Sequence, residues 1–126
     1  MLGHLKIFRV EKTGEILVIQ PHGDASAFRY QDLQQEANAI RAALGKPDVS
    51  HLVIELSQLN YFGSEFIGSL VSMAREVRNR RGKATMCAAT DQMLEVLQNM
   101  SLFKLWPYFE TQAEAIAFIE SETAAS

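Results

Sequence analysis

The chain has 126 residues, of which 48% are hydrophobic, with one Trp, three Tyr and seven Phe. This is the length of one ordinary domain, and the apolar content is enough for a core, which excludes a disordered chain. The net charge of -3 gives no global attraction to nucleic acid or anionic membranes, and no apolar run approaches the roughly 20 residues of a spanning helix.

The first part of the chain predicts a β-hairpin. Two β-prone runs, Lys6–Val10 and Ile16–Gln20, are separated by a polar segment that contains the turn-forming pair Thr13–Gly14. Pro, His, Gly and Asp at positions 21–24 then break the strand pattern. Among them, Asp24 is predicted either to cap the next helix or to lie in a loop over the end of the sheet.

A helix and a central strand follow. From about Phe28 to Leu44, apolar residues recur at helical spacing, at Leu33, Ala37, Ile40 and Leu44. Gly45, with Lys-Pro-Asp after it, predicts the end of this helix. The run His51–Ser57 is continuously apolar at positions 52–54, which predicts a strand buried on both faces, as in parallel sheets covered by helices.

The second half of the chain alternates helices and strands. A helix from Ser64 to about Arg80 has an apolar face made of Ile67, Leu70, Val71, Ala74 and Val77. Gly82 ends it, and the small-residue strand Ala84–Ala89 follows. Thr90 or Asp91 then caps a short helix that runs to Asn99.

The end of the chain predicts one more strand and one more helix. Residues 102–109 contain a short strand broken by Pro107, and the last helix runs from about Gln112 to Ile119. The order ββαβαβαβα indicates a single α/β domain over residues 1–120, with a mixed sheet of about five strands and about four helices. Residues 121–126 are small and polar and are predicted to form a flexible tail.

The patterns that would signal an enzyme or a metal site are incomplete. Gly63 and Gly68 follow a strand as in a P-loop, but Ser69 stands where that motif needs Lys, and G-x-S-x-G is absent. The three His share no ligand spacing with one another or with Cys87, which is predicted to be a buried, inert thiol. We therefore expect no metal, no cofactor and no enzymatic activity.

The localisation and the arginine-rich helix end have simple explanations. A lone cysteine and a charged N-terminus without a signal-peptide core predict a cytoplasmic protein. Arginines crowd the end of the Ser64 helix, at Arg75, Arg78, Arg80 and Arg81. They are interpreted as a solvated helix end that complements the helix dipole, with anion or partner binding as the alternative.

Ser64 stands where the central strand turns into a helix. Serine is a favoured N-cap, so capping is the simplest interpretation. Phe66, Ser69 and Met73 share the helix face away from the predicted core stripe, and with Tyr61 they are predicted to form an exposed apolar docking patch. The alternative is that Phe66 and Tyr61 lean over the sheet edge and are half buried.

This strand–turn–helix resembles the signature of STAS domains, the family named for sulphate transporters and anti-sigma factor antagonists. The run VIELSQLNYFGSEFIGSL, residues 53–70, is similar to the family's strand and the D-S-[ST]-G-[LI] segment after it. Asp24 matches a family loop in place, and Gly82-Lys83 and the Met-Ser-Leu-Phe at 100–103 also look like family segments. The full order of elements matches that of the family.

The resemblance implies a signalling protein of the anti-sigma factor antagonist type. In such proteins the serine at the position of Ser64 is phosphorylated by a partner kinase, often the anti-sigma factor, and a phosphatase resets it. The resemblance makes Ser64 the phosphoacceptor candidate. It implies an interaction with these proteins, and a homodimer stays open. The net charge and the hydropathy predict no nucleic-acid partner and no membrane insertion. The docking candidates are Asp24, Tyr61, Gly63, Glu65, Phe66, Ser69 and Met73.

Three departures from the family pattern keep other functions open. Gly63 replaces the usual Asp, Glu65 replaces the second Ser/Thr, and Phe66 replaces the Gly. The alternative is a STAS scaffold or small-ligand sensor that binds its partner constitutively. A small enzyme that uses Ser64 or Asp24 is a third hypothesis. The sequence pattern shows no general base and no oxyanion-stabilising group that would accompany either residue.

Overall fold

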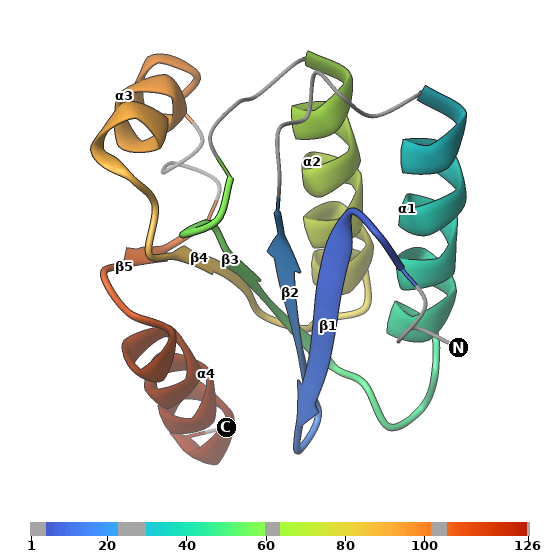
Figure 1. Cartoon of the computed structure of the whole chain (residues 1–126). Coiled ribbons are helices and arrows are strands. Elements are labelled where there is room, and N and C mark those ends of the chain that lie inside the picture. Colours follow the sequence, from blue (N-terminus) through green and yellow to red (C-terminus); the bar gives the residue numbers. More distant parts are fainter. Residues whose placement is uncertain (1–4, 23–29, 60–63, 102–105, 126) are drawn as a thin grey trace.

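The computed structural model describes residues 5–22, 30–59, 64–101 and 106–125, which form a five-stranded mixed sheet and four helices (Figure 1). The elements follow the predicted order ββαβαβαβα, so the predicted fold class is confirmed. Their bounds are β1 Phe8–Thr13, β2 Ile16–Pro21, α1 Tyr30–Leu44, β3 His51–Glu55, α2 Ser64–Asn79, β4 Ala84–Cys87, α3 Asp91–Asn99, β5 Tyr108–Phe109 and α4 Gln112–Ala125.

The strands lie side by side in sequence order, β1-β2-β3-β4-β5, so β3 is the middle strand. β1 and β2 form the predicted antiparallel hairpin, and every other neighbouring pair is parallel. The hairpin turn is one residue later than predicted, because Thr13 pairs with Ile16 and only Gly14 and Glu15 lie between them. Gly14 has φ of +60°, a conformation that glycine adopts without steric cost.

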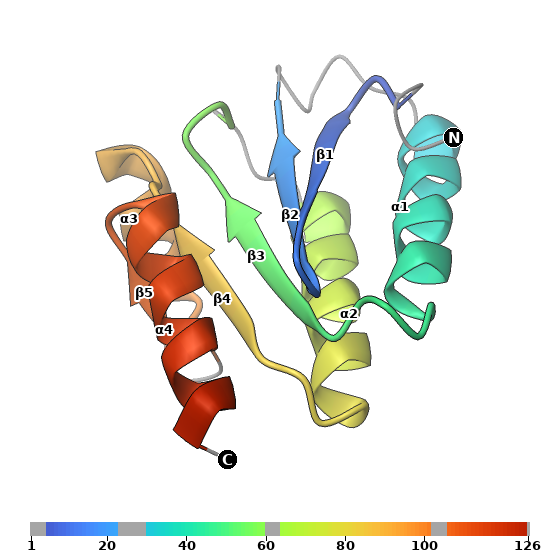
Figure 2. The ribbon, with the colours of Figure 1, turned by 90° about the horizontal axis from the view of Figure 1, so that it is seen from below.

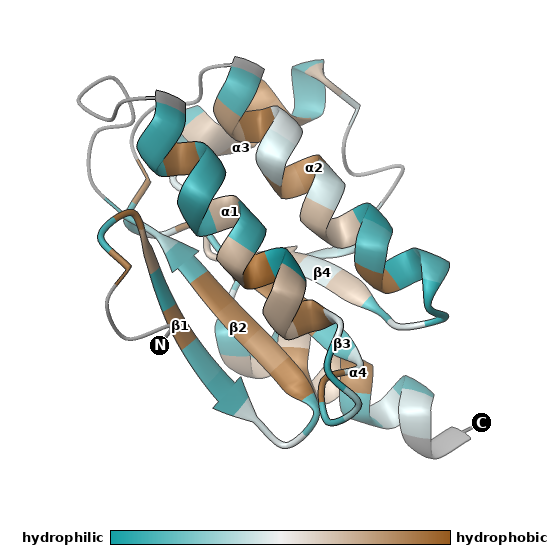
Figure 3. Cartoon of the chain, turned by 90° about the vertical axis from the view of Figure 1, so that its right-hand side faces the viewer, coloured by the Kyte–Doolittle hydropathy of each residue, from teal (hydrophilic) through white to brown (hydrophobic). Residues whose placement is uncertain are grey.

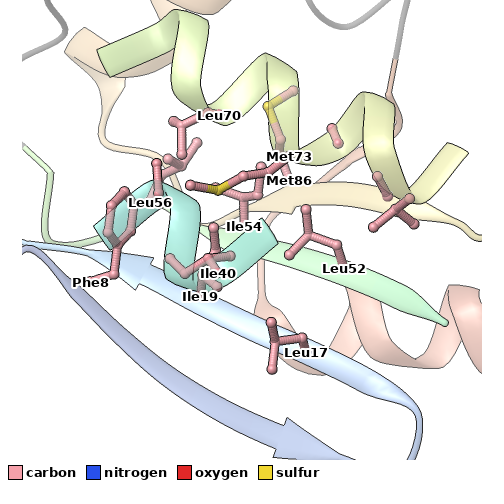
Figure 4. Packing of buried hydrophobic residues seen from close by; sticks show 14 of the residues in the cluster. Phe8, Leu17, Ile19, Ile40, Leu52, Ile54, Leu56, Leu70, Met73 and Met86 are labelled. Carbon is pink, nitrogen blue, oxygen red and sulfur yellow. The ribbon is translucent and has the colours of Figure 1, made fainter. Parts of the chain in front are cut away.

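Alternating residues of the central strands face two separate hydrophobic clusters. Leu17, Ile19, Leu52 and Ile54 face the larger cluster, beneath α1, α2 and α3. Figure 4 shows these side chains directed toward Ile40 of α1 and Leu70 and Met73 of α2. Ile16, Val18 and Val53 face the smaller cluster, which Ala115 and Ile119 of α4 complete.

The two faces of the sheet are therefore covered unequally. Figure 2 shows α4 on the side of the sheet away from α1 and α2, next to β4 and β5. In Figure 3, β2 is hydrophobic along most of its length, whereas β1 is mostly hydrophilic. The burial of the side chains agrees with this. All residues of β2 except Gln20 are buried, whereas most residues of β1 are exposed. The prediction that the middle strand is buried on both faces is confirmed.

The last helix is longer than predicted. α4 continues to Ala125, so residues 121–125 are helical where the sequence suggested a flexible tail. The Oγ1 of Thr123 donates a hydrogen bond of 2.7 Å to the carbonyl of Ile119, and its contact of 3.4 Å with Nε2 of His51 ties this turn to β3. The end of the domain at residue 120 stays a prediction.

Candidate functional site

Ser64 is the first helical residue of α2. The helix follows the carboxyl end of β3, the middle strand, so its N-terminus lies over the centre of that edge of the sheet (Figure 1). Open parallel sheets place binding sites beyond the carboxyl ends of their strands. The cap formed by the Ser64 hydroxyl stays a prediction, because that side chain lies outside the described part. So do the roles of Asp24, Tyr61 and Gly63, whose positions are not described.

The first turn of α2 presents a permanent negative charge beside Ser64. Glu65 is exposed and lies in the first turn, where its carboxylate is favourably placed against the positive end of the helix dipole. Glu65 also lines an open cleft of about 340 Å³ between α1 and α2. The other lining residues are Gln34, Arg41, Gly68, Ser69 and Ser72. This cleft is the surface that continues from Ser64 along the helix.

The predicted exposed patch is wrong for its two large apolar members. Phe66 is 3% exposed and its ring packs on Phe8 of β1, with centroids 5.6 Å apart and an interplanar angle of 33°. Met73 is fully buried in the larger cluster. Ser69 is also buried, and its hydroxyl donates to the carbonyl of Glu65 at 3.2 Å. Phe66 and Met73 therefore do not present their side chains to solvent as an apolar docking patch would require.

The position of α2 in the fold explains this difference. α2 packs against β3 and β4 and lies beside α1, so more than one stripe of its surface is covered. Its exposed residues form a narrow polar stripe, which includes Glu65, Gly68, Arg75 and Asn79. A docking partner at this end of the molecule therefore meets polar and charged side chains of α2.

A buried carboxylate, which the sequence analysis did not single out, holds the carboxyl end of β3. Glu55 is 8% exposed, and its two oxygens accept 2.5 Å hydrogen bonds from Nε2 of Gln20 and from the backbone N–H of Ser57. These contacts join the ends of β2 and β3 to the segment that leads toward Ser64. The available signal was a glutamate inside the apolar run LVIEL, where an unpaired charge would be costly.

Cys87 lies opposite Glu55 on the neighbouring strand. Burial, together with the nearby Glu55 charge, raises the pKa of the Cys87 thiol to about 12. The thiol is fully covered and therefore stays protonated at neutral pH, where it is a poor nucleophile. The prediction that this thiol is buried is confirmed, and its inertness stays a prediction.

The remaining titratable candidates do not gather into a metal site in the described part of the chain. Within residues 5–22, 30–59, 64–101 and 106–125, no three His, Cys, Asp or Glu side chains are placed to hold a metal ion. Nδ1 of His51 accepts a 3.0 Å hydrogen bond from the backbone N–H of Lys83. Burial lowers the pKa of His51, with opposing effects from Glu15, which raises it, and Lys83, which lowers it. None of the described helices is long and apolar enough to cross a membrane.

The arginine-rich end of α2 is solvated, as predicted, and Arg80 has a defined role. Its Nη1 donates a 2.7 Å hydrogen bond to the carbonyl of Leu44, the last residue of α1. This satisfies one of the carbonyls that a helix C-terminus leaves without a partner. Arg75, Arg78 and Arg81 are exposed.

Solved structures of anti-sigma factor antagonists have the same fold. SpoIIAA from Bacillus in its phosphorylated form is 23% identical, with a TM-score of 0.70 over 89% of this chain and 98% of that chain. The unphosphorylated form of SpoIIAA is 22% identical, with a TM-score of 0.75 over 90% and 96%. A STAS domain protein from Planctomyces limnophilus is 24% identical, with a TM-score of 0.74 over 90% and 97%.

A family comparison covers most of the same region. The model of the STAS domain matches residues 8–115, from the first residue of β1 to the first turn of α4. The match includes the β3–α2 junction on which the resemblance rests. The chain therefore belongs to the STAS domain family.

Proposed function

We propose that this protein is an anti-sigma factor antagonist whose docking to a partner is switched by phosphorylation of Ser64. The observation that carries the proposal is the position of Ser64 as the first residue of α2, after the middle strand, in a chain that shares its fold with SpoIIAA. The partners are an anti-sigma factor with serine kinase activity and a phosphatase that removes the phosphate. The unphosphorylated protein binds the anti-sigma factor, and a sigma factor is released.

The electrostatics of the helix end favour such a modification. A phosphoserine adds about -1.5 to -2 charges at neutral pH, and a helix N-terminus stabilises added negative charge. The chain is similar to both the phosphorylated and the unphosphorylated form of SpoIIAA, with TM-scores of 0.70 and 0.75. We therefore expect phosphorylation to leave the fold intact. The charge would act at the interface, through repulsion and the cost of desolvation.

The polar surface of α2 makes this interface sensitive to charge. Phe66 and Met73 are buried, so they do not contribute to the surface next to Ser64. The described part of that surface consists of the exposed Glu65 and the polar cleft between α2 and α1. A partner that meets Glu65 must offer positive or hydrogen-bonding groups there. A second, larger negative charge on the adjacent residue changes that complementarity directly.

Glu65 also favours one competing function, constitutive docking. A fixed carboxylate in the first turn already supplies a negative charge at this place, and it repels a phosphate on the neighbouring residue. In that case the protein is a STAS scaffold or a small-ligand sensor, and the only role of Ser64 is to cap the helix.

The two functions are separated by one experiment. The purified chain is incubated with ATP and extract from its own cells, and any phosphate is mapped by mass spectrometry. The switch predicts a phosphate on Ser64 that Ser64→Ala abolishes and that Ser72→Ala, a serine two turns along the same helix, leaves in place. If the chain stays unmodified in an extract that phosphorylates a known antagonist, the switch is wrong.

A binding measurement then tests the consequence of the charge. Ser64→Asp should weaken binding to the anti-sigma factor about tenfold or more, whereas Ser64→Ala should bind as the unmodified protein does. Equal affinity of the two variants would contradict the switch and favour constitutive docking.

A further inference from the structure

The outer edge of β1 is a row of backbone groups with no strand beside it in the described part of the chain. β1 comes first in the order β1-β2-β3-β4-β5, so it has a neighbouring strand on one side only. Figure 3 shows β1 along the margin of the sheet. The opposite edge strand, β5, has two residues, whereas β1 has six. A strand edge of that length is a template on which another strand can pair.

The pairing with β2 decides which backbone groups of β1 face outward. The carbonyl of Ile7 accepts the N–H of His22, so the groups of Ile7 face β2 and those of Phe8 face away from it. Because this direction alternates along a strand, the groups of Val10 and Lys12 also face outward. Among the described residues, none forms a backbone hydrogen bond with Val10 or Lys12 on this side.

The exposed side chains of β1 include two opposite charges. Val10 packs against the larger hydrophobic cluster, so its neighbours Arg9 and Glu11 lie on the other face of the sheet. Both side chains are exposed. The one ion pair in the described part of the chain joins Lys12 to Asp48 at 3.3 Å and involves neither of them. Arg9 and Glu11 are therefore available to a partner strand.

A two-fold axis through Val10 makes this edge complementary to itself. In a closed dimer the two copies of β1 are related by such an axis and pair antiparallel. Val10 then lies opposite Val10 of the second copy, and the two residues exchange both of their backbone hydrogen bonds. Arg9 of each copy lies opposite Glu11 of the other, in a non-hydrogen-bonded pair, where opposing side chains come closest.

The neighbouring registers lack this complementarity. The outward-facing residues of both strands must meet, so the register can shift only in steps that preserve the alternation. One step in one direction sets Arg9 opposite Arg9, and one step in the other sets Glu11 opposite Glu11. Like charges directly opposite each other destabilise a pair of strands. Charge therefore selects the register centred on Val10.

We infer that β1 is a self-association edge, at which two copies of this chain join their sheets into one. In the Val10 register, the N–H of Lys12 in each copy also donates to the carbonyl of Phe8 in the other. The N–H of Phe8 takes no part, because it is bonded to the carboxylate of Glu36. The ladder is short, so the dimer is weak: it forms at high micromolar concentration, and the dilute chain is monomeric. The proposed switch at Ser64 uses none of these residues.

The first test is sedimentation equilibrium of the ¹⁵N-labelled chain up to millimolar concentration, with NMR spectra of the same samples. We expect a monomer–dimer equilibrium and concentration-dependent shifts of the amides of Val10 and Lys12. A chain that stays monomeric would overturn the proposal and leave this edge to a strand of another protein. A dimer whose shifts are confined to another surface would overturn it as well.

Charge reversal tests the register. Arg9→Glu places like charges opposite each other twice and should weaken the dimer at least tenfold. Adding Glu11→Arg restores both opposite-charge pairs and should return the dissociation constant to within threefold of the wild type. Arg75→Glu makes the same change in net charge at an exposed position of α2 and should change it less than twofold. Equal losses in Arg9→Glu and Arg75→Glu, or no recovery in the double variant, would overturn the proposal.

Discussion

At the carboxyl end of the parallel strands, two buried carboxylates accept hydrogen bonds from distant segments, whereas at the amino end two connections meet in a close backbone contact. Glu55 joins β2 and β3 at the carboxyl end. Glu36 of α1 accepts hydrogen bonds from the N–H groups of Lys6, Ile7 and Phe8, where the chain enters β1 beside the end of β2. At the amino end, Gly82 lies against the Ser50 carbonyl.

The difference bears on what each end of the sheet can do. Side-chain anchors fix the strand ends and leave the connections beyond them to vary in sequence, which suits a surface that must recognise a partner. Close backbone packing leaves little freedom, so the connections at the amino end keep one shape. Substitutions at each end of the sheet test this contrast.

Gly82→Ala should be the most damaging change. The added Cβ would lie 1.8 Å from the Ser50 carbonyl oxygen and 2.7 Å from Cγ1 of Val77, so two connections and α2 have to move apart. We expect a loss of more than about 4 kcal/mol in the free energy of unfolding, or no folded protein. Gly68→Ala is the matched control, because nothing lies within 4 Å of its Cβ. It should stabilise the helix by up to about 1 kcal/mol. Equal stability of the two variants in urea unfolding would refute the backbone contact.

Phe66→Ala should be the next most damaging, because Phe66 packs in the core at the start of α2. Removing a buried phenyl ring that contacts Phe8 should lower the free energy of unfolding by about 3 kcal/mol or more. Met100→Ala, at an apolar side chain that is 46% exposed, should change it by less than about 0.5 kcal/mol. If Phe66→Ala left the free energy of unfolding nearly unchanged but abolished partner binding, the prediction of an exposed docking patch at Phe66 would be right after all.

Glu36→Gln tests the carboxylate anchor directly. The amide has one oxygen where the carboxylate had two, so at least one of the three backbone N–H groups loses its acceptor. We expect a loss of about 2 kcal/mol in the free energy of unfolding. Glu11→Gln, at an exposed site on β1, should be neutral. If both variants unfold at the same urea concentration, Glu36 is not an anchor.

His51 should add a small pH dependence at the amino end. Because burial lowers the pKa of His51 in the folded chain, its neutral form contributes stability above the unfolded pKa of about 6.5. That contribution is lost as the pH falls through the folded pKa, since protonated Nδ1 no longer accepts the Lys83 N–H. His51→Asn keeps a hydrogen-bond acceptor but has no titrating group. Between pH 7 and pH 5, the midpoint temperature of thermal unfolding should therefore fall further in the wild type than in this variant. Parallel pH profiles would contradict the assignment.

Much of the fold follows from local patterns. The spacing of Leu33, Ala37 and Ile40 predicted α1, and the run of apolar residues after His51 predicted a strand covered on both faces. Thr90 was one of two predicted caps, and its Oγ1 accepts the N–H of Met93 at 3.2 Å. These features depend on neighbours along the chain, which a sequence displays directly.

The amino-acid sequence was sufficient to predict the order of elements, the family pattern and the place of Ser64 at the start of α2. The tertiary structure decided that Phe66 and Met73 are buried, because α2 packs on the middle of the sheet beside α1 and not at its edge. It also decided the hydrogen-bond partners of two buried carboxylates. Phe8 lies 28 residues from Glu36 in the sequence, and Gln20 lies 35 residues from Glu55. Helical spacing reports the direction of each side chain from its own axis. The neighbours that cover it are set by how distant segments pack together.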